Sequence, residues 1–440
     1  EGFTLIRDPQ TNWICYAELS PDGNEYVSTG VIYHGKSTSS RRRPSRRNKR
    51  INRNAIRKKQ QMVKDALGYD EIISEAPLRN LPHQFAPAPD DELDSEPMVV
   101  TGLTLLVDFS DQRATVSQQE IDNFCNQAGY NGNRNNGSIY DYFYEVSNGL
   151  VRYNNIVTPY IRVTYPKSYY DQGPGYGPVS DLITDALTRL RDEGFDFSQL
   201  STDHRNRVIC LNVLYAGSAT AGWANGLWPH MGTYMGRFSV DGISFSRYQM
   251  TSIGNALTLG TFVHENGHLL FGWPDLYSYD VHSNGVGSYC VMNTINTATN
   301  PQMPNAWFRY IAGWITVTDI TNSPLGTLYS HEPNSHTAFV YYGETTGSSR
   351  ELFMIEARRR TGRSSGLPGE GLLIWHIDQD GDNTKQGHIP NVALIQADGR
   401  KDLENMRNSG DRNDPFYAGH NDRFYDNSNP AAVWHNRVSS

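Results

Sequence analysis

Two histidines four positions apart flank a glutamate in the stretch Thr261–Leu270, TFVHENGHLL. On a helix, His264 and His268 project from the same face, so both imidazoles can reach one ion. Neutral imidazoles suit Zn²⁺ at roughly 2.0–2.1 Å, and Glu265 stands beside the ion, where it can take a proton from water. The pattern predicts a hydrolytic zinc centre: the metal lowers the pKa of water to about 7 and polarises a carbonyl, while Glu265 acts as base and then as acid.

A catalytic zinc ion needs a third protein ligand and an open fourth position. We expect the helix to end at Gly272 with a positive φ, and Pro274 prevents it from resuming. The chain then turns and can bring Asp275 back to the metal, with Asp280 and His282 as the alternatives. The competing interpretation is two surface histidines without a metal. The apolar residues around the motif favour a buried helix, and hence the metal.

The segments His264–Tyr277 and Gly287–Asn293 together resemble the immune inhibitor A family of secreted metalloendopeptidases, relatives of the metzincins. In that family a glycine turn and a Pro-Asp pair follow the zinc helix, and a methionine turn forms a hydrophobic floor beneath the metal. The resemblance implies that Met292 is that methionine and that the protein is a secreted zinc endopeptidase, a hydrolase of protein peptide bonds. The chain departs from the usual pattern at Phe271, which occupies the glycine position, so the glycine and the acidic residue both come one position later.

The resemblance extends over nearly the whole chain and implies an α+β fold: a metzincin-like zinc-peptidase domain with a mixed sheet and a zinc-binding helix. A small β-rich propeptide precedes this domain, and a mainly β domain follows it. The expected boundaries are 1–75 for the propeptide-like segment, 76–97 for a Pro-rich acidic linker, 98–315 for the catalytic domain and 316–440 for the β-rich C-terminal domain. Outside the motifs above, the segments that carry the resemblance include Leu105–Asp111, Gly137–Phe143, Asn305–Trp307 and Gly369–Asp378.

The elements that must position the zinc helix are predicted from hydrophobic patterning. Residues 1–34 alternate polar and apolar side chains around a turn, which predicts a small antiparallel sheet. Strands and helices then alternate, as in a mixed sheet covered by helices. The predicted elements are a strand at Met98–Asp108, a helix opened by a capping box at Ser117–Glu120, a helix at 178–194, a strand at Arg207–Leu214, and short strands at 352–356, 372–377 and 392–396.

The net charge of −8 conceals an uneven distribution along the 440 residues. Residues 36–61 carry twelve of the 39 Lys and Arg and no Asp or Glu, which leaves 27 basic against 47 acidic side chains, a net charge of −20, elsewhere. The basic segment contains no aromatic residue, which disfavours nucleic-acid binding. It is either a solvated linker or, as the resemblance implies, the place where a trypsin-like protease cuts, at Arg41–Arg43 or Arg46–Arg50, to activate a latent zymogen.

Acidic residues near the C-terminus are candidates for structural calcium binding. Asp378, Asp380 and Asp382 offer three carboxylates at alternating positions, but the bidentate glutamate of an EF-hand is missing after them. Asp411 and Asp414 form a second candidate. Solvated turns are the alternative interpretation of both.

The longest apolar runs, such as Leu372–Trp375, are far shorter than the ~18–20 residues that span a bilayer, so no membrane span is expected. The chain begins with Glu1, which we interpret as the start of a processed product. Together with the resemblance, this start predicts a secreted, monomeric protein that acts on proteins or peptides. A non-catalytic binding or adhesion protein on a degenerate peptidase fold is the main alternative, and hydrolysis of a small amide is another. Glu265 beside both histidines favours catalysis, because a binding protein has no need of it.

Overall fold

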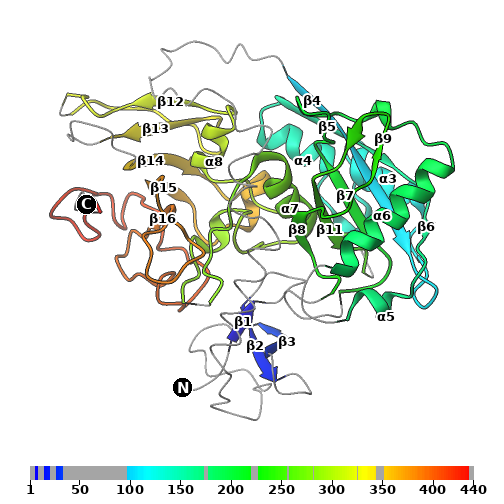
Figure 1. Ribbon diagram of the computed structural model, residues 1–440. Helices are drawn as coiled ribbons and strands as arrows, with labels where there is room; N and C mark the ends of the chain where they lie inside the picture. The colour runs from blue at the N-terminus through cyan, green and yellow to red at the C-terminus, as the bar shows by residue number, and fades with distance from the viewer. Residues whose placement is uncertain are drawn as a thin grey trace, which may run out of the picture.

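The structure is a computed structural model, and it describes residues 5–7, 14–19, 26–32, 97–172, 177–219, 226–254, 257–280, 282–324, 326–342 and 351–435. The architecture is mixed α/β, which is compatible with the expected α+β class. Within these ranges the strands form four sheets, of three, two, six and five strands. Figure 1 shows the six-stranded and five-stranded sheets on either side of the helix that carries the two motif histidines.

The six-stranded sheet is built around β4 (Met98–Asp108), which has the predicted bounds. The path runs β5-β4-β7-β11-β8, and β6 pairs with the end of β4. All these pairings are parallel except that of the edge strand β8 with β11. A parallel strand covered on both faces is rich in apolar residues and does not alternate regularly, which matches the Val- and Leu-rich sequence of β4. The remaining strands are β5 (Val151–Val157), β6 (Ile161–Arg162), β7 (Leu211–Tyr215), β8 (His230–Thr233) and β11 (Arg247–Ser252).

Helices cover both faces of this sheet. On one face α3 (Gln118–Asn126), α4 (Ile139–Val146) and α7 (Leu259–Phe271) share a buried core with side chains of β4, β5 and β7. On the other face α6 (Gly177–Asp192) packs on the alternate side chains of β4 and β7. The capping box predicted for α3 is half formed, since the Ser117 side chain accepts from the Glu120 backbone. The shorter helices are α5 (Lys167–Tyr170), α8 (Ala306–Ile311) and the 3₁₀ turns η1 (Gly132–Arg134), η2 (Phe197–Gln199), η3 (Gly287–Tyr289) and η4 (Gly362–Gly366).

The prediction for the strand at Arg207–Leu214 is wrong at its start, because β7 begins only at Leu211. The carboxylate of Asp203 accepts hydrogen bonds from the backbone N–H and the guanidinium of Arg207. These bonds hold 203–207 as a turn, and Arg207 makes only an isolated bridge, to Ser244. Nearby, β9 (Ser239–Val240) and β10 (Ile243–Ser244) form the two-stranded sheet.

The five-stranded sheet has the strands in chain order and shares the α7 core. It consists of β12 (Thr316–Asp319), β13 (Thr337–Tyr341), β14 (Glu351–Arg358), β15 (Gly371–Asp378) and β16 (Val392–Ile395). β14 and β15 contain the predicted strands 352–356 and 372–377, and β16 matches the predicted strand 392–396 except that it ends one residue earlier. Inward residues of β14 and β15, including Met354 and Trp375, belong to the same buried cluster as α7 and α8.

A buried ion network lies where α8 meets this sheet. The Glu356 carboxylate accepts from Arg309 at 2.5 Å and from Arg358 at 2.7 Å, and Trp375 Nε1 donates to its other oxygen at 2.8 Å. All these side chains are almost fully buried, so each charge depends on its partners. The network fixes α8 against β14 and β15.

The N-terminal strands β1 (Leu5–Arg7), β2 (Ile14–Leu19) and β3 (Tyr26–Ile32) form a three-stranded antiparallel sheet, as predicted. The basic segment 36–61, and all of the 76–97 linker except its last residue, lie outside the described residues.

Candidate metal centre

Helix α7 carries His264, Glu265 and His268, and almost all of its side chains are buried. It ends as predicted, at Gly272, whose φ of 63° is the left-handed conformation that glycine adopts without strain. The N–H of Gly272 bonds to the carbonyl of His268 at 2.9 Å, which closes the last turn. The apolar residues of the helix therefore bury it against the sheet while the histidine-bearing face meets the chain that follows.

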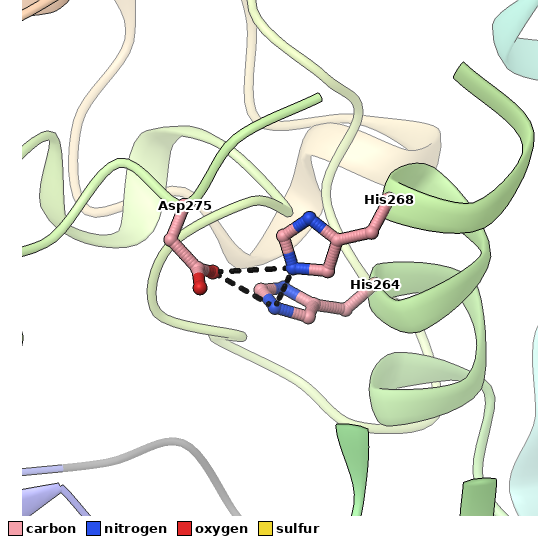
Figure 2. Close-up of side chains that lie close together, drawn as sticks. All are labelled: His264, His268 and Asp275. Carbon is pink, nitrogen blue, oxygen red and sulfur yellow. Dashed lines mark hydrogen bonds and ion pairs between the residues drawn. The ribbon is translucent and has the colours of Figure 1, made fainter. Parts of the chain in front are cut away.

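The chain after Gly272 returns to the helix and brings Asp275 to both histidines (Figure 2). Oδ1 of Asp275 lies 3.1 Å from Nε2 of His264 and 3.4 Å from Nε2 of His268. The two Nε2 atoms are 3.2 Å apart. The alternative ligands are not part of this group, since Asp280 and His282 pair with each other at 3.7 Å.

Backbone carbonyls determine which nitrogen of each imidazole faces this group. Nδ1 of His264 lies 2.8 Å from the carbonyl of Val291, and Nδ1 of His268 lies 2.5 Å from the carbonyl of Trp273. A carbonyl only accepts hydrogen bonds, so in the neutral rings Nδ1 carries the proton and each Nε2 offers a lone pair. Metal-binding histidines are oriented in this way by a bond from the other ring nitrogen.

The separations within the group suit a tetrahedral ion. Ligand bonds of about 2.0–2.1 Å place the ligand atoms of a tetrahedron roughly 3.3–3.4 Å apart. The three observed separations, 3.1, 3.2 and 3.4 Å, are close to this value. Two lone pairs and a carboxylate oxygen at such distances repel one another, and a cation between them removes the repulsion. The group can therefore hold a metal ion with three protein ligands.

The surroundings of Asp275 favour the ionised form of its carboxyl group. Burial by itself raises the pKa of the carboxyl, but His268 and His264 outweigh burial and hold the pKa far below its ordinary range. Its second oxygen, Oδ2, accepts a hydrogen bond from the hydroxyl of Tyr279 at 2.8 Å. Sequence reasoning missed Tyr279, because a tyrosine four residues after the aspartate is not distinctive among the 26 tyrosines of the chain.

Glu265 is buried beside the group on the same helix. Burial is the main cause that raises the pKa of its carboxyl, to about 7, while His264 lowers it and Asp275 raises it further. The backbone N–H of Met231, on the edge strand β8, bonds to this carboxylate. A carboxyl with a pKa near 7 can both take up and release a proton at neutral pH.

Met292 lies under α7, in the segment 287–293 that the sequence singled out. It is fully buried, and a Cβ placed on Gly267 would lie 2.5 Å from its sulfur, so the thioether rests against the helix backbone beside His268. The same segment bonds to both other parts of the site. Val291 accepts from His264, and the carbonyl of Met292 accepts from the backbone of Leu276 at 2.9 Å.

The residues expected to bind calcium are distributed over two places. Asp411 groups with Asp398 and Asp402, with one carboxylate oxygen of each within 4.8 Å of the others. Asp414 is adjacent, and its Oδ2 accepts from the backbone N–H of Asp411 at 2.6 Å.

The run Asp378, Asp380 and Asp382 does not form such a group among the described residues. An oxygen of Asp378 accepts from the N–H of Asp380, and the Asp382 carboxylate accepts from Thr384 and pairs with Lys385 at 2.8 Å.

Comparison of the chain with protein-family models and with curated proteins finds no match in either set. Within the described residues, no helix is both long and apolar enough to cross a bilayer.

Proposed function

We propose that the chain is a secreted zinc-dependent endopeptidase of the immune inhibitor A type, with a metzincin-like catalytic domain. The single observation that carries this proposal is the buried convergence of His264 Nε2, His268 Nε2 and Asp275 Oδ1 at 3.1–3.4 Å, with a proton-accepting Glu265 on the same helix. Two imidazoles and one carboxylate are a ligand set of catalytic zinc sites, which keep a fourth position for water or substrate.

In this mechanism His264, His268 and Asp275 would hold the ion, and the carbonyls of Val291 and Trp273 keep the two rings in place. Zinc supplies a polarised scissile carbonyl and water of lowered pKa. Glu265 takes the proton of the attacking water and passes it to the leaving nitrogen. The N–H of Met231 orients the Glu265 carboxylate for this transfer.

We also propose that the enzyme is made as a latent zymogen. Residues 1–75 are then a propeptide that contains the three-stranded sheet, and a trypsin-like protease cuts in the basic segment 36–61. The −20 charge of the rest of the chain attracts a basic arm until cleavage. Limited trypsin treatment of the purified chain should raise casein cleavage several-fold; unchanged activity after complete cleavage in 36–61 would contradict latency.

The alternative of a non-catalytic binding protein is less well supported. Burying a glutamate costs free energy, and a binding surface gains nothing from a buried Glu265 beside two histidines and an aspartate. Hydrolysis of a small amide uses the same groups and differs only in its substrate. Cleavage of a casein-type substrate therefore distinguishes an endopeptidase from a small-amide hydrolase.

The test of the proposed function is Glu265→Gln, which keeps the shape of the side chain and removes its proton transfer. Casein cleavage should fall by about 10²–10⁴-fold or more while zinc per chain stays unchanged. Glu193→Gln, at an exposed position after α6, is the matched control and should leave cleavage unaltered. Equal cleavage by Glu265→Gln and wild type would exclude this mechanism.

For the acidic group at Asp398, Asp402 and Asp411 we propose calcium as the ion. Burial, together with the charges of Asp411 and Asp398, raises the pKa of the Asp414 carboxyl to about 7. Oδ1 of Asp414 is buried and has no hydrogen-bond partner within the described part of the chain. Calcium takes six to eight oxygen ligands and relieves the repulsion in such a group.

A further inference from the structure

Four side chains converge on one face of the five-stranded sheet, far along the chain from α7. Glu351 on β14 is directly opposite Asp378 on β15, and His376 lies two residues before Asp378. Side chains two apart on a strand, and those directly opposite across a pair, point to the same face, so these three project together. His435 lies over them, and its backbone N–H donates to Glu351 at 2.7 Å. We name these four residues the β14–β15 cluster.

The distances in the β14–β15 cluster resemble those at the α7 site. Nδ1 of His435 lies 3.3 Å from Oε1 of Glu351 and 3.3 Å from Oδ2 of Asp378. Nε2 of His376 lies 2.6 Å from the same Glu351 oxygen. The two 3.3 Å separations match the edge of a tetrahedron of zinc ligands, roughly 3.3–3.4 Å. The 2.6 Å contact is a hydrogen bond, and it lengthens when both groups bind an ion.

The cluster carries two negative charges with little access to water. The side chains of Asp378 and Glu351 are 2% and 15% exposed, and like charges directly opposite each other destabilise a sheet.

His435 does not complete the cluster by hydrogen bonding. Its Nδ1 is buried and, among the residues that the structure describes, has no hydrogen-bond partner, although both carboxylates are near. Neither carboxylate oxygen therefore lies along the direction of an N–H bond at Nδ1. A cation between the ring and the two carboxylates gives Nδ1 of His435 the partner that it lacks among the described residues.

We propose that the β14–β15 cluster binds a divalent transition-metal ion of the zinc type. Two imidazoles suit zinc and disfavour calcium, and the two charges of the ion balance the two carboxylates. Ligand atoms of Glu351, His376 and His435 all lie within 4.8 Å of one another, and Asp378 lies beside them, with Oδ2 3.3 Å from Nδ1 of His435. The rings of His376 and His435 are stacked, with centroids 4.3 Å apart and planes at 14°, so one ring turns for both nitrogens to face the ion.

Such an ion fastens the C-terminal segment to the sheet. Trp434, the neighbour of His435, packs on Phe353 with ring centroids 4.8 Å apart and on His376 at 6.1 Å. These contacts come from the same face of β14 and β15. The ion therefore adds coordination bonds next to the aromatic contacts of Trp434. Loss of the ion weakens the attachment of residues 433–435 to the sheet.

The test counts zinc ions per chain in the full-length protein after equilibration with excess zinc and removal of unbound ion. Wild type should hold two ions and His435→Gln one, while His435→Gln keeps its casein cleavage because the α7 site is intact. Glu351→Gln is a second variant that should also hold one ion. His420→Gln changes an exposed histidine that bonds to the Asn413 carbonyl, and it should hold two.

Three outcomes separate this inference from the proposed function. Two ions in His435→Gln and in Glu351→Gln overturn the inference. One ion in wild type that His435→Gln also retains overturns it as well. One ion in wild type and none in His435→Gln supports the inference and contradicts zinc at α7.

Discussion

Tyr279→Phe tests whether Asp275 is a metal ligand that a hydrogen bond holds in place. The substitution removes only the hydroxyl that donates to Oδ2 of Asp275 at 2.8 Å, and the ring remains. A hydrogen bond to a charged group contributes about 1.5–3 kcal/mol, and 1.4 kcal/mol corresponds to tenfold in an equilibrium constant. If this bond forms fully only when Asp275 is oriented toward the ion, its loss weakens zinc binding by roughly 10- to 100-fold.

The assay is competition for zinc between the protein and a chromophoric chelator of known affinity, at fixed pH and ionic strength. Tyr144→Phe, at a side chain 45% exposed on α4, is the control and should leave the affinity unchanged. The thermal midpoint of each variant without metal shows whether the fold is retained. A zinc affinity of Tyr279→Phe within twofold of wild type, with the fold intact, would refute the role of Asp275 as an oriented ligand.

Three further predictions concern the fold and the proposed calcium site. Glu356→Gln leaves Arg309 in a buried site without its ionic partner, so denaturant unfolding should show a loss of about 3–5 kcal/mol; a loss below about 1 kcal/mol would contradict the network. Burial lowers the pKa of His230 to about 4, so between about pH 6.5 and pH 4 the unfolded chain binds more protons than the folded one, and stability should fall as the pH drops through this range. Thermal unfolding at a series of pH values should show a flatter pH dependence for His230→Gln. An unchanged slope would contradict the role of His230. Calcium should raise the thermal midpoint of wild type and of Asp382→Asn but not of Asp402→Asn. The reverse pattern would show that calcium binds instead at the run that contains Asp382.

The sequence was sufficient to predict the structure where a residue acts through its own backbone conformation or within its own strand. Met98–Asp108 is a strand because a parallel strand buried on both faces tolerates no polar alternation. Gly272 ends α7 because the left-handed conformation there suits glycine. The three residues proposed to bind zinc lie within twelve positions of one another, so a helix and one turn predict that they meet.

Other features depend on contacts between distant segments and could not be predicted. β7 starts late because the Asp203 side chain captures Arg207, which is a matter of hydrogen bonding and not of hydrophobic pattern. The carbonyls of Val291 and Trp273 have no sequence signal, since every residue has one. His435 contacts Glu351, which lies 84 positions earlier in the chain. The register of β14 with β15 is what brings Glu351, His376 and Asp378 to the same face of the sheet.

The central claim is that a zinc ion binds at α7 through His264, His268 and Asp275, and a crystal of the zinc-loaded protein measured at the zinc absorption edge tests it most directly. The account predicts an anomalous peak at about 2.0–2.1 Å from Nε2 of both histidines and at a similar distance from an Asp275 oxygen. No peak between these three side chains in a crystal grown with excess zinc would contradict the account.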